Sequence, residues 1–192
     1  FNPQQGQHRL SSPDDQWWKL MQHSSASTQV IAIRHIKTDQ ELTQDQQSAL
    51  MEKLQSAERA TTLHAISATE RLASSQDNEI SDSLAGQIRN LVDHRDDEIR
   101  AKAMCALTTI KRIDGSTIDA AASMIEEDTR HVVFAGVHAL TTVDQVPEYI
   151  LPSFDRSFIK ALKACDYEFV GLFTKGYTRW HDDPKQHLEQ LL

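Results

Sequence analysis

The pattern of apolar and polar positions repeats itself in the middle of this chain. The phrase Ala106-Leu107-Thr108-Thr109-Ile110 is followed 33 residues later by Ala139-Leu140-Thr141-Thr142-Val143. Around both copies, apolar residues recur at the three- and four-residue spacing of one helix face. A period near 33 residues is typical of stacked helical repeats, so the pattern predicts antiparallel helix pairs.

Each unit of the repeat has two predicted helices around an acidic turn. In the first unit the turn Arg95-Asp96-Asp97 precedes a second helix over 98–112, and in the second unit Glu127-Asp128-Thr129 precedes one over 130–143. Small residues recur on the apolar faces of both second helices. They predict that helices of neighbouring repeats approach closely, and they are Ala103, Ala106, Ala135, Gly136 and Ala139.

Residues 80–143 resemble the HEAT-repeat family. Asp97-Glu98-Ile99-Arg100, followed by Ala103 and Ala106, is similar to the turn aspartate, the hydrophobic–arginine pair and the small positions of that family. The second unit has Val132-Val133 in place of the hydrophobic–arginine pair, which puts the Asp–Arg ladder of the family in question here. The resemblance implies an all-α fold in which antiparallel helix pairs stack as a short, right-handed, HEAT-like α-solenoid.

The remaining segments complete the predicted domain organisation. Residues 1–11 are polar and Gln-rich, so we expect a disordered lead or a linker. Residues 12–192 form a single helical-repeat domain, with irregular N-terminal helices over 12–57, repeats over about 58–143, and an irregular aromatic-rich C-terminal repeat over 144–192.

Local signals predict the N-terminal helices. Ser12-Pro13 begins a helix that carries Trp17 and Trp18, which cannot both face the core because they are adjacent. The apolar run 30–36 fits either a strand or a buried helix, and the absence of a partner strand favours helix. Thr43-Gln44-Asp45-Gln46 has the pattern of a capping box at the start of a helix to about residue 57.

Composition and charge narrow the classes of partner. Of the 192 residues, 39% are hydrophobic and only 6 are Gly and 5 Pro, which favours helices over an all-β fold. The net charge of −8, from 28 acidic and 20 basic residues, argues against nucleic acid, because such binding depends on Lys and Arg. We expect a protein or peptide partner. The alternative explanation of the negative net charge is that it keeps the protein soluble.

The sequence contains few candidates for a disulfide, a metal site or a catalytic site. Cys105 and Cys165 lie on predicted apolar helix faces, so we expect buried free thiols rather than a disulfide. His131 and His138 share a helix face, but two turns place them roughly 10 Å apart, too far for one metal ion. The chain has no Gly-x-Ser-x-Gly motif and no phosphate-binding Gly-rich loop, so we expect no cofactor, no metal and no enzymatic activity.

Binding remains as the expected activity. Stacked helix pairs curve, and their second helices line a concave surface on which a peptide or protein can lie. The candidate contacts are Arg100, Lys102, Lys111, Arg130, His131, His138, Tyr177 and Trp180, together with Trp17 and Trp18 as an aromatic pair at the N-terminal end. For each of them, an ordinary solvated or packed helix face is the alternative interpretation.

The functional hypothesis from the sequence is therefore a non-catalytic protein-interaction scaffold. The alternatives are a periplasmic inhibitor or immunity protein that blocks an enzyme with its acidic turns at 93–98 and 126–128, and an enzyme with an unrecognised site. The chain begins at Phe1 rather than Met, so we expect that a preceding segment was removed, either by processing or because the sequence is a piece cut from a longer one, and a signal peptide or a membrane anchor is a candidate for that segment. This expectation favours a periplasmic or envelope-associated location over a cytoplasmic one.

Overall fold

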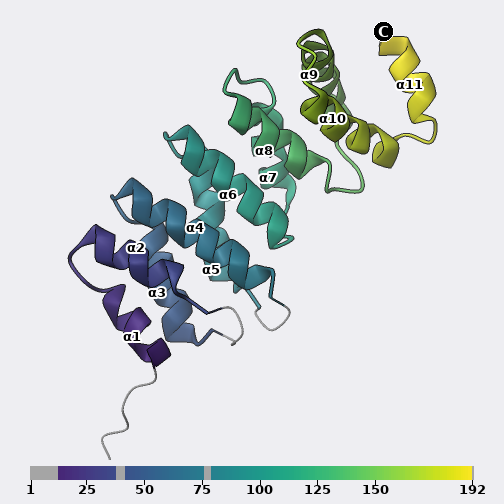
Figure 1. Cartoon of the computed structure of the whole chain (residues 1–192). Helices are drawn as coiled ribbons and strands as arrows, with labels where there is room; N and C mark the ends of the chain where they lie inside the picture. Colours follow the sequence, from purple (N-terminus) through teal and green to yellow (C-terminus); the bar gives the residue numbers. More distant parts are fainter. Residues whose placement is uncertain (1–12, 38–41, 76–78, 192) are drawn as a thin grey trace, which may run out of the picture.

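The computed structural model describes residues 13–37, 42–75 and 79–191, and these ranges form helices and turns without any strand (Figure 1). The predicted lead over 1–11 lies outside the described residues. The α-helices are α1 (Pro13–Leu20), α2 (Ala26–Arg34), α3 (Gln44–Leu54), α4 (Arg59–Ala73), α5 (Asp82–Asn90), α6 (Asp97–Thr109), α7 (Gly115–Met124), α8 (Arg130–Leu140), α9 (Leu151–Lys163), α10 (Tyr167–Trp180) and α11 (Pro184–Leu191). Two short 3-10 helices, η1 (Leu91–Asp93) and η2 (Glu148–Ile150), precede α6 and α9.

The helices stack as a solenoid of antiparallel pairs, which confirms the predicted all-α repeat architecture. Within the pairs, α1 contacts α2, α3 contacts α4, α5 contacts α6, α7 contacts α8, and α9 contacts α10. Between the pairs, each second helix contacts the next, from α2 through α4, α6 and α8 to α10. Figure 1 shows these second helices following one another along the stack, with α1 and α11 at opposite ends of it.

Side-chain caps explain where several helices begin. The predicted capping box is present at α3, where the Thr43 hydroxyl accepts from the Gln46 amide and the Gln46 side chain accepts from the Thr43 amide. At α6, α7 and α10 an aspartate carboxylate caps the first turn, and these residues are Asp96, Asp114 and Asp166.

Two helices end in a left-handed residue that is not glycine. Lys111 (φ 57°) follows α6 and Cys165 (φ 55°) follows α9, and in each case the next amide donates back to the last turn in a Schellman motif. The predicted second helix over 98–112 therefore ends at Thr109. Cys165 is exposed in this turn, so the prediction that it lies buried on a helix face was wrong, whereas Cys105 is partly buried in α6; both are free.

The repeated phrase forms part of a continuous core. Ala106, Leu107 and Leu140 are fully buried and Ala139 is 1% exposed, so the Ala-Leu part of the phrase faces the core in both second helices. Gly136 has a different role from the predicted contact between repeats. A Cβ there would lie 2.7 Å from the Ala121 carbonyl oxygen, so its size sets the approach of α8 to α7 within one pair.

The N-terminal end follows the predicted helices with one difference. The apolar run over 30–36 lies mostly in α2, as predicted, yet Ile31 is 53% exposed because α2 turns one apolar side chain away from the core. Trp17 and Trp18 are both half-buried, and Trp17 stacks on His35 with ring centres 4.4 Å apart.

Candidate functional site: the inner face of the second helices

The second helices present one continuous accessible stripe, here called the inner stripe. Apolar side chains of these helices point into the core, which leaves every third or fourth position exposed or half-buried. From one end of the solenoid to the other, the main members of the inner stripe are Ile31, Arg34, His64, Arg71, Lys102, Thr109, His138 and Lys175.

This stripe lies on the concave side of the stack. From α2 to α8, contacts between successive second helices are more extensive than those between successive first helices, of which only α3 and α5 are in substantial contact. A two-layer stack bends toward the layer whose members are closer together, so the second helices form the inner layer. The stripe is therefore on the inner side of the stack.

Ion pairs link the beginnings of neighbouring second helices. Arg59, the first residue of α4, reaches the Asp96 carboxylate at 2.7 Å and also pairs with Glu98 at the start of α6. Arg130, the first residue of α8, pairs in the same way with Asp166 at 3.2 Å and with Glu168 at the start of α10. Hydrogen bonds from these arginines lower the pKa of the Asp96 and Asp166 carboxyl groups.

A different set of contacts joins α6 to α8. Arg100 donates two hydrogen bonds to Glu127, both at 2.7 Å, and a third to Asp97 at 2.8 Å, while the Thr129 hydroxyl donates to Asp97 at 2.9 Å. The hydrogen bonds with Arg100 and Thr129 lower the pKa of Asp97. Arginine–carboxylate pairs thus join successive second helices and are here called the ion-pair ladder, but Arg100 reaches the next repeat through Glu127 rather than through an aspartate.

A pocket of about 360 Å³ opens between the fourth and fifth helix pairs. Its apolar wall contains Ile125, Val133, Ala161 and Phe169, and the Arg130 guanidinium lies 4.9 Å above the centre of the Phe169 ring. Ion pairs line its rim, where Arg156 contacts Glu126 at 2.8 Å and Lys160 contacts Asp128 at 3.0 Å. All of these charged side chains already have a partner within the protein.

The predicted basic contacts divide between paired and accessible groups. Arg100 and Arg130 belong to the ion-pair ladder, and Lys102 pairs with Glu70 at 2.5 Å. Lys111 lies in the exposed turn after α6, outside the inner stripe. His131 is exposed at the start of α8. Their role in binding stays a prediction.

His138 is half-buried in the inner stripe and faces the next repeat. Its ring stacks on Phe134 with centroids 6.2 Å apart, and its buried Nδ1 atom has no hydrogen-bond partner among the described residues. Burial, followed by the nearby charge of Lys175, lowers the pKa of His138. The neutral imidazole therefore fits this place best.

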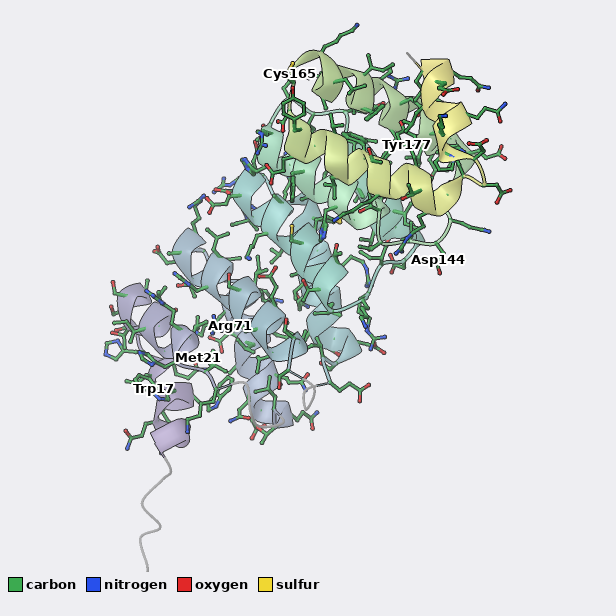
Figure 2. All side chains as sticks on the ribbon, turned by 45° about the vertical axis from the view of Figure 1, so that its right-hand side comes forward. Trp17, Met21, Arg71, Asp144, Cys165 and Tyr177 are labelled. Carbon is green, nitrogen blue, oxygen red and sulfur yellow. The ribbon has the colours of Figure 1, made fainter. Side chains whose placement is uncertain are left out.

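The aromatic candidates of α10 serve packing instead. Tyr177 is fully buried, and its hydroxyl donates to the Asp155 carboxylate at 2.6 Å, so the prediction that Tyr177 contacts a partner was wrong. Burial raises the pKa of this phenol. Trp180 is half-buried against Phe154 and donates its indole N–H to the Val143 carbonyl at 3.0 Å. Both side chains hold the last pair together; Tyr177 is labelled in Figure 2.

Sequence reasoning missed a basic cluster at the other end of the inner stripe. Arg34 and Arg71 are exposed and His64 is half-buried beside them. The signal was present in the spacing, because His64 and Arg71 are separated by two helical turns and therefore share one face of α4. What the sequence did not show is that α2 places Arg34 next to this face.

The described residues contain neither a cluster of metal ligands nor a membrane-spanning helix. Across the described ranges, no group of three or more His, Cys, Asp and Glu side chains is arranged to hold a metal ion. No helix in the part of the chain that the structure describes is long and apolar enough to cross a membrane.

Comparison with known proteins supports the fold. No family model matches the chain, and no curated protein does. A designed armadillo repeat protein in complex with the peptide (KR)4 is 14% identical, with a TM-score of 0.61 over 94% of this chain and 88% of that one. Computationally designed armadillo repeat proteins for modular peptide recognition align at 12% identity and a TM-score of 0.56, covering 88% of this chain and 82% of theirs. The chain is a helical-repeat solenoid similar to armadillo proteins, and HEAT repeats are not singled out.

Proposed function

We propose that this protein is a non-catalytic scaffold that binds an extended segment of another protein along its inner stripe. The observation that carries the proposal is the stripe itself, an accessible path that crosses α2, α4, α6, α8 and α10 without interruption. The likeness to solenoids designed for peptide recognition supports it. A HEAT-type origin of residues 80–143 belongs to the same proposal.

The geometry sets the length of a suitable ligand. Packed helices lie about 8–10 Å apart, so the path from α2 to α10 is roughly 40 Å long. An extended chain spans about 3.3 Å per residue, and a peptide of about twelve residues therefore covers the stripe.

The inhibitor alternative receives less support from the structure. It relied on free acidic turns, but Asp96, Asp97 and Glu127 are paired with arginines of the ladder. Glu126 and Asp128 are paired with Arg156 and Lys160 at the rim of the pocket. These carboxylates already stabilise contacts between repeats.

A peptide selection tests the proposed function. A random library of twelve-residue peptides displayed on phage is selected against the immobilised protein, and the captured peptides are then measured against two variants. Ser67→Trp places a bulky side chain in the inner stripe of α4, whereas Ser83→Trp places the same side chain on an exposed position of α5 in the outer layer. We expect Ser67→Trp to abolish capture and Ser83→Trp to leave it unchanged, with both proteins showing the parental circular dichroism spectrum.

Equal capture by both variants would contradict the proposed site. Failure of the library to yield any peptide that the folded protein retains would contradict the proposed function itself.

A further inference from the structure

The end of the inner stripe formed by α2 and α4 carries three basic side chains without an acidic partner among the described residues. They are Arg34 near the end of α2 and His64 and Arg71 on α4, here called the basic cluster. Most other arginines of the described chain pair with a carboxylate, as Arg59, Arg100 and Arg130 do in the ladder. An unpaired group of this kind stands out in a protein with a net charge of −8.

The contacts between α2 and α4 hold the cluster together. One guanidinium nitrogen of Arg71 donates to the Ile33 carbonyl at 3.1 Å, which holds the Arg71 side chain against the last turn of α2, where Arg34 follows Ile33 in the chain. Figure 2 shows Arg71 on the layer of second helices, near where α2 and α4 meet. Burial, and then the charges of Arg34 and Arg71, lower the pKa of His64, in agreement with three basic groups in one neighbourhood.

Two described glutamates of α4 and α6 pair with basic groups outside the cluster. Glu70, which precedes Arg71, points toward α6 and pairs with Lys102 at 2.5 Å. Glu98 pairs with Arg59 at the edge of the stack. Among the described residues, this end of the inner stripe therefore carries unpaired basic groups, although the whole chain is acidic.

An accessible apolar surface adjoins the cluster. Ile31 lies one helical turn before Arg34 and is 53% exposed, one of the few large apolar side chains exposed to this extent in the described residues. Leu63, on α4 beside His64, is half-buried. Positive charge beside an apolar surface fits a ligand that alternates carboxylates with apolar side chains.

Resting on the proposed function, we propose that the basic cluster selects acidic peptides: Arg34, His64 and Arg71 bind carboxylate side chains of an extended segment, and Ile31 contacts an apolar side chain next to them. The designed armadillo protein in complex with (KR)4 has a ligand of the opposite charge. Arg34 and Arg71 carry the same sign as that ligand, so this end of the inner stripe would repel it.

Three labelled peptides test the charge preference directly. The probe is a fluorescein-labelled twelve-residue peptide that repeats Glu-Leu-Ser, and its counterparts carry Gln or Lys in place of every Glu. Fluorescence anisotropy with the full chain gives a dissociation constant for each. We expect the glutamate peptide to bind at least about tenfold more tightly than the glutamine peptide, and the lysine peptide to bind most weakly.

Two charge-reversing variants locate the preference. Arg34→Glu changes an exposed side chain with no hydrogen bond among the described residues, so it should fold normally. Lys163→Glu, on an exposed position of α9 in the other layer, changes the net charge by the same amount and is the matched control. We expect Arg34→Glu to weaken the glutamate peptide about tenfold and Lys163→Glu to change its affinity less than about twofold.

The outcomes separate this inference from the proposed function. If the lysine or glutamine peptide binds as tightly as the glutamate peptide, or if Arg34→Glu and Lys163→Glu have equal effects, the inference fails. Capture of non-acidic library peptides in a way that Ser67→Trp abolishes would then leave the proposed function standing. If neither the library nor the three labelled peptides bind, both fail.

Discussion

The contact of α8 with α6 and the contact of α8 with α10 are made by different kinds of side chain. Toward α6 the packing is extensive and relies on small side chains, since Ala103, Ala106 and Ala135 are fully buried. Toward α10 the contact is smaller and relies on Phe134 and Phe169, whose rings meet edge to face at 5.7 Å, and on the ion pairs of Arg130. One helix thus joins a close-packed repeat to a more open one.

The difference explains why the pocket lies where it does. Alanines let two helix backbones approach until no space remains between them, whereas two phenylalanine rings hold the backbones further apart. The ion pairs of Arg130, Arg156 and Lys160 then bridge the rim rather than fill the interior. We infer that the first four pairs behave as a rigid unit to which the fifth pair is attached more loosely.

The largest expected effect is from a charge placed in the close-packed contact. Ala139→Asp puts an unpaired carboxylate at a position that is 1% exposed, and we expect a loss of roughly 3–5 kcal/mol in the free energy of unfolding. His131→Asp adds the same charge at an exposed position in the first turn of the same helix, where the helix dipole tolerates it. Urea unfolding followed by circular dichroism compares them, and equal stability of the two variants would contradict the assignment of α8 to the core.

A smaller effect should distinguish two glycines, one in each of the compared helices. Gly136→Ala in α8 would bring a methyl group within 2.7 Å of the Ala121 carbonyl oxygen, and we expect a loss of roughly 1–3 kcal/mol. Gly171→Ala in α10 meets no atom within 4 Å, so the same substitution should stabilise by about 0.5–1 kcal/mol. Thermal unfolding of both variants checks the opposite signs.

The ion pairs of Arg130 should affect the local stability of α9 and α10 rather than the global stability of the protein. Arg130→Gln removes contacts at the open junction, while Arg59→Gln removes the equivalent contacts between α4 and α6, where apolar packing remains. Because exposed ion pairs contribute little to global stability, we expect nearly unchanged unfolding midpoints. We expect faster amide hydrogen exchange in α9 and α10 for Arg130→Gln only. Equal exchange in both variants would mean that the two junctions do not differ in rigidity.

The smallest effect we expect concerns pH. The pKa of His138 is lowered in the folded state, so the unfolded chain binds a proton more readily, and stability falls as the pH drops below about 6.5. Above that pH the neutral form dominates in both states and the effect is absent. Between pH 8 and pH 5, the free energy of unfolding of His138→Gln, measured by urea titration, should fall less than that of the parent. An equal fall in both proteins would contradict the predicted contribution of His138 to the pH dependence of stability.

The features of the fold that could be predicted from the sequence are those that depend on the local spacing of residues. The doubled phrase predicted buried second helices because Ala106 and Ala139 recur at helical spacing on an apolar face, and the side chains of Thr43 and Gln46 were enough to predict a capping box. Contacts between repeats depend on the stagger of one pair on the next, which no local spacing encodes. The partners of Arg130, and the burial of Tyr177, therefore appeared only in the structure.

The basic cluster illustrates the same limit. His64 and Arg71 could be placed on one face of α4 from their spacing, but Arg34 joins them only because α2 packs against α4. Ile31 was part of an apolar run that favoured burial, yet it is 53% exposed in the structure.

In the ion-pair ladder, the charge at the start of the second helices alternates from one helix to the next. Arginine is the first residue of α4 and of α8, whereas aspartate caps α6 and α10, so basic and acidic starts alternate from α4 to α10. Removing two consecutive pairs would leave this alternation intact. Removing one pair, such as α5 with α6, would bring the start of α4 against the start of α8 and set Arg59 against Arg130. The pairing of charges at the starts of the second helices is therefore kept when the solenoid is shortened by two helix pairs. It is lost when the solenoid is shortened by one pair.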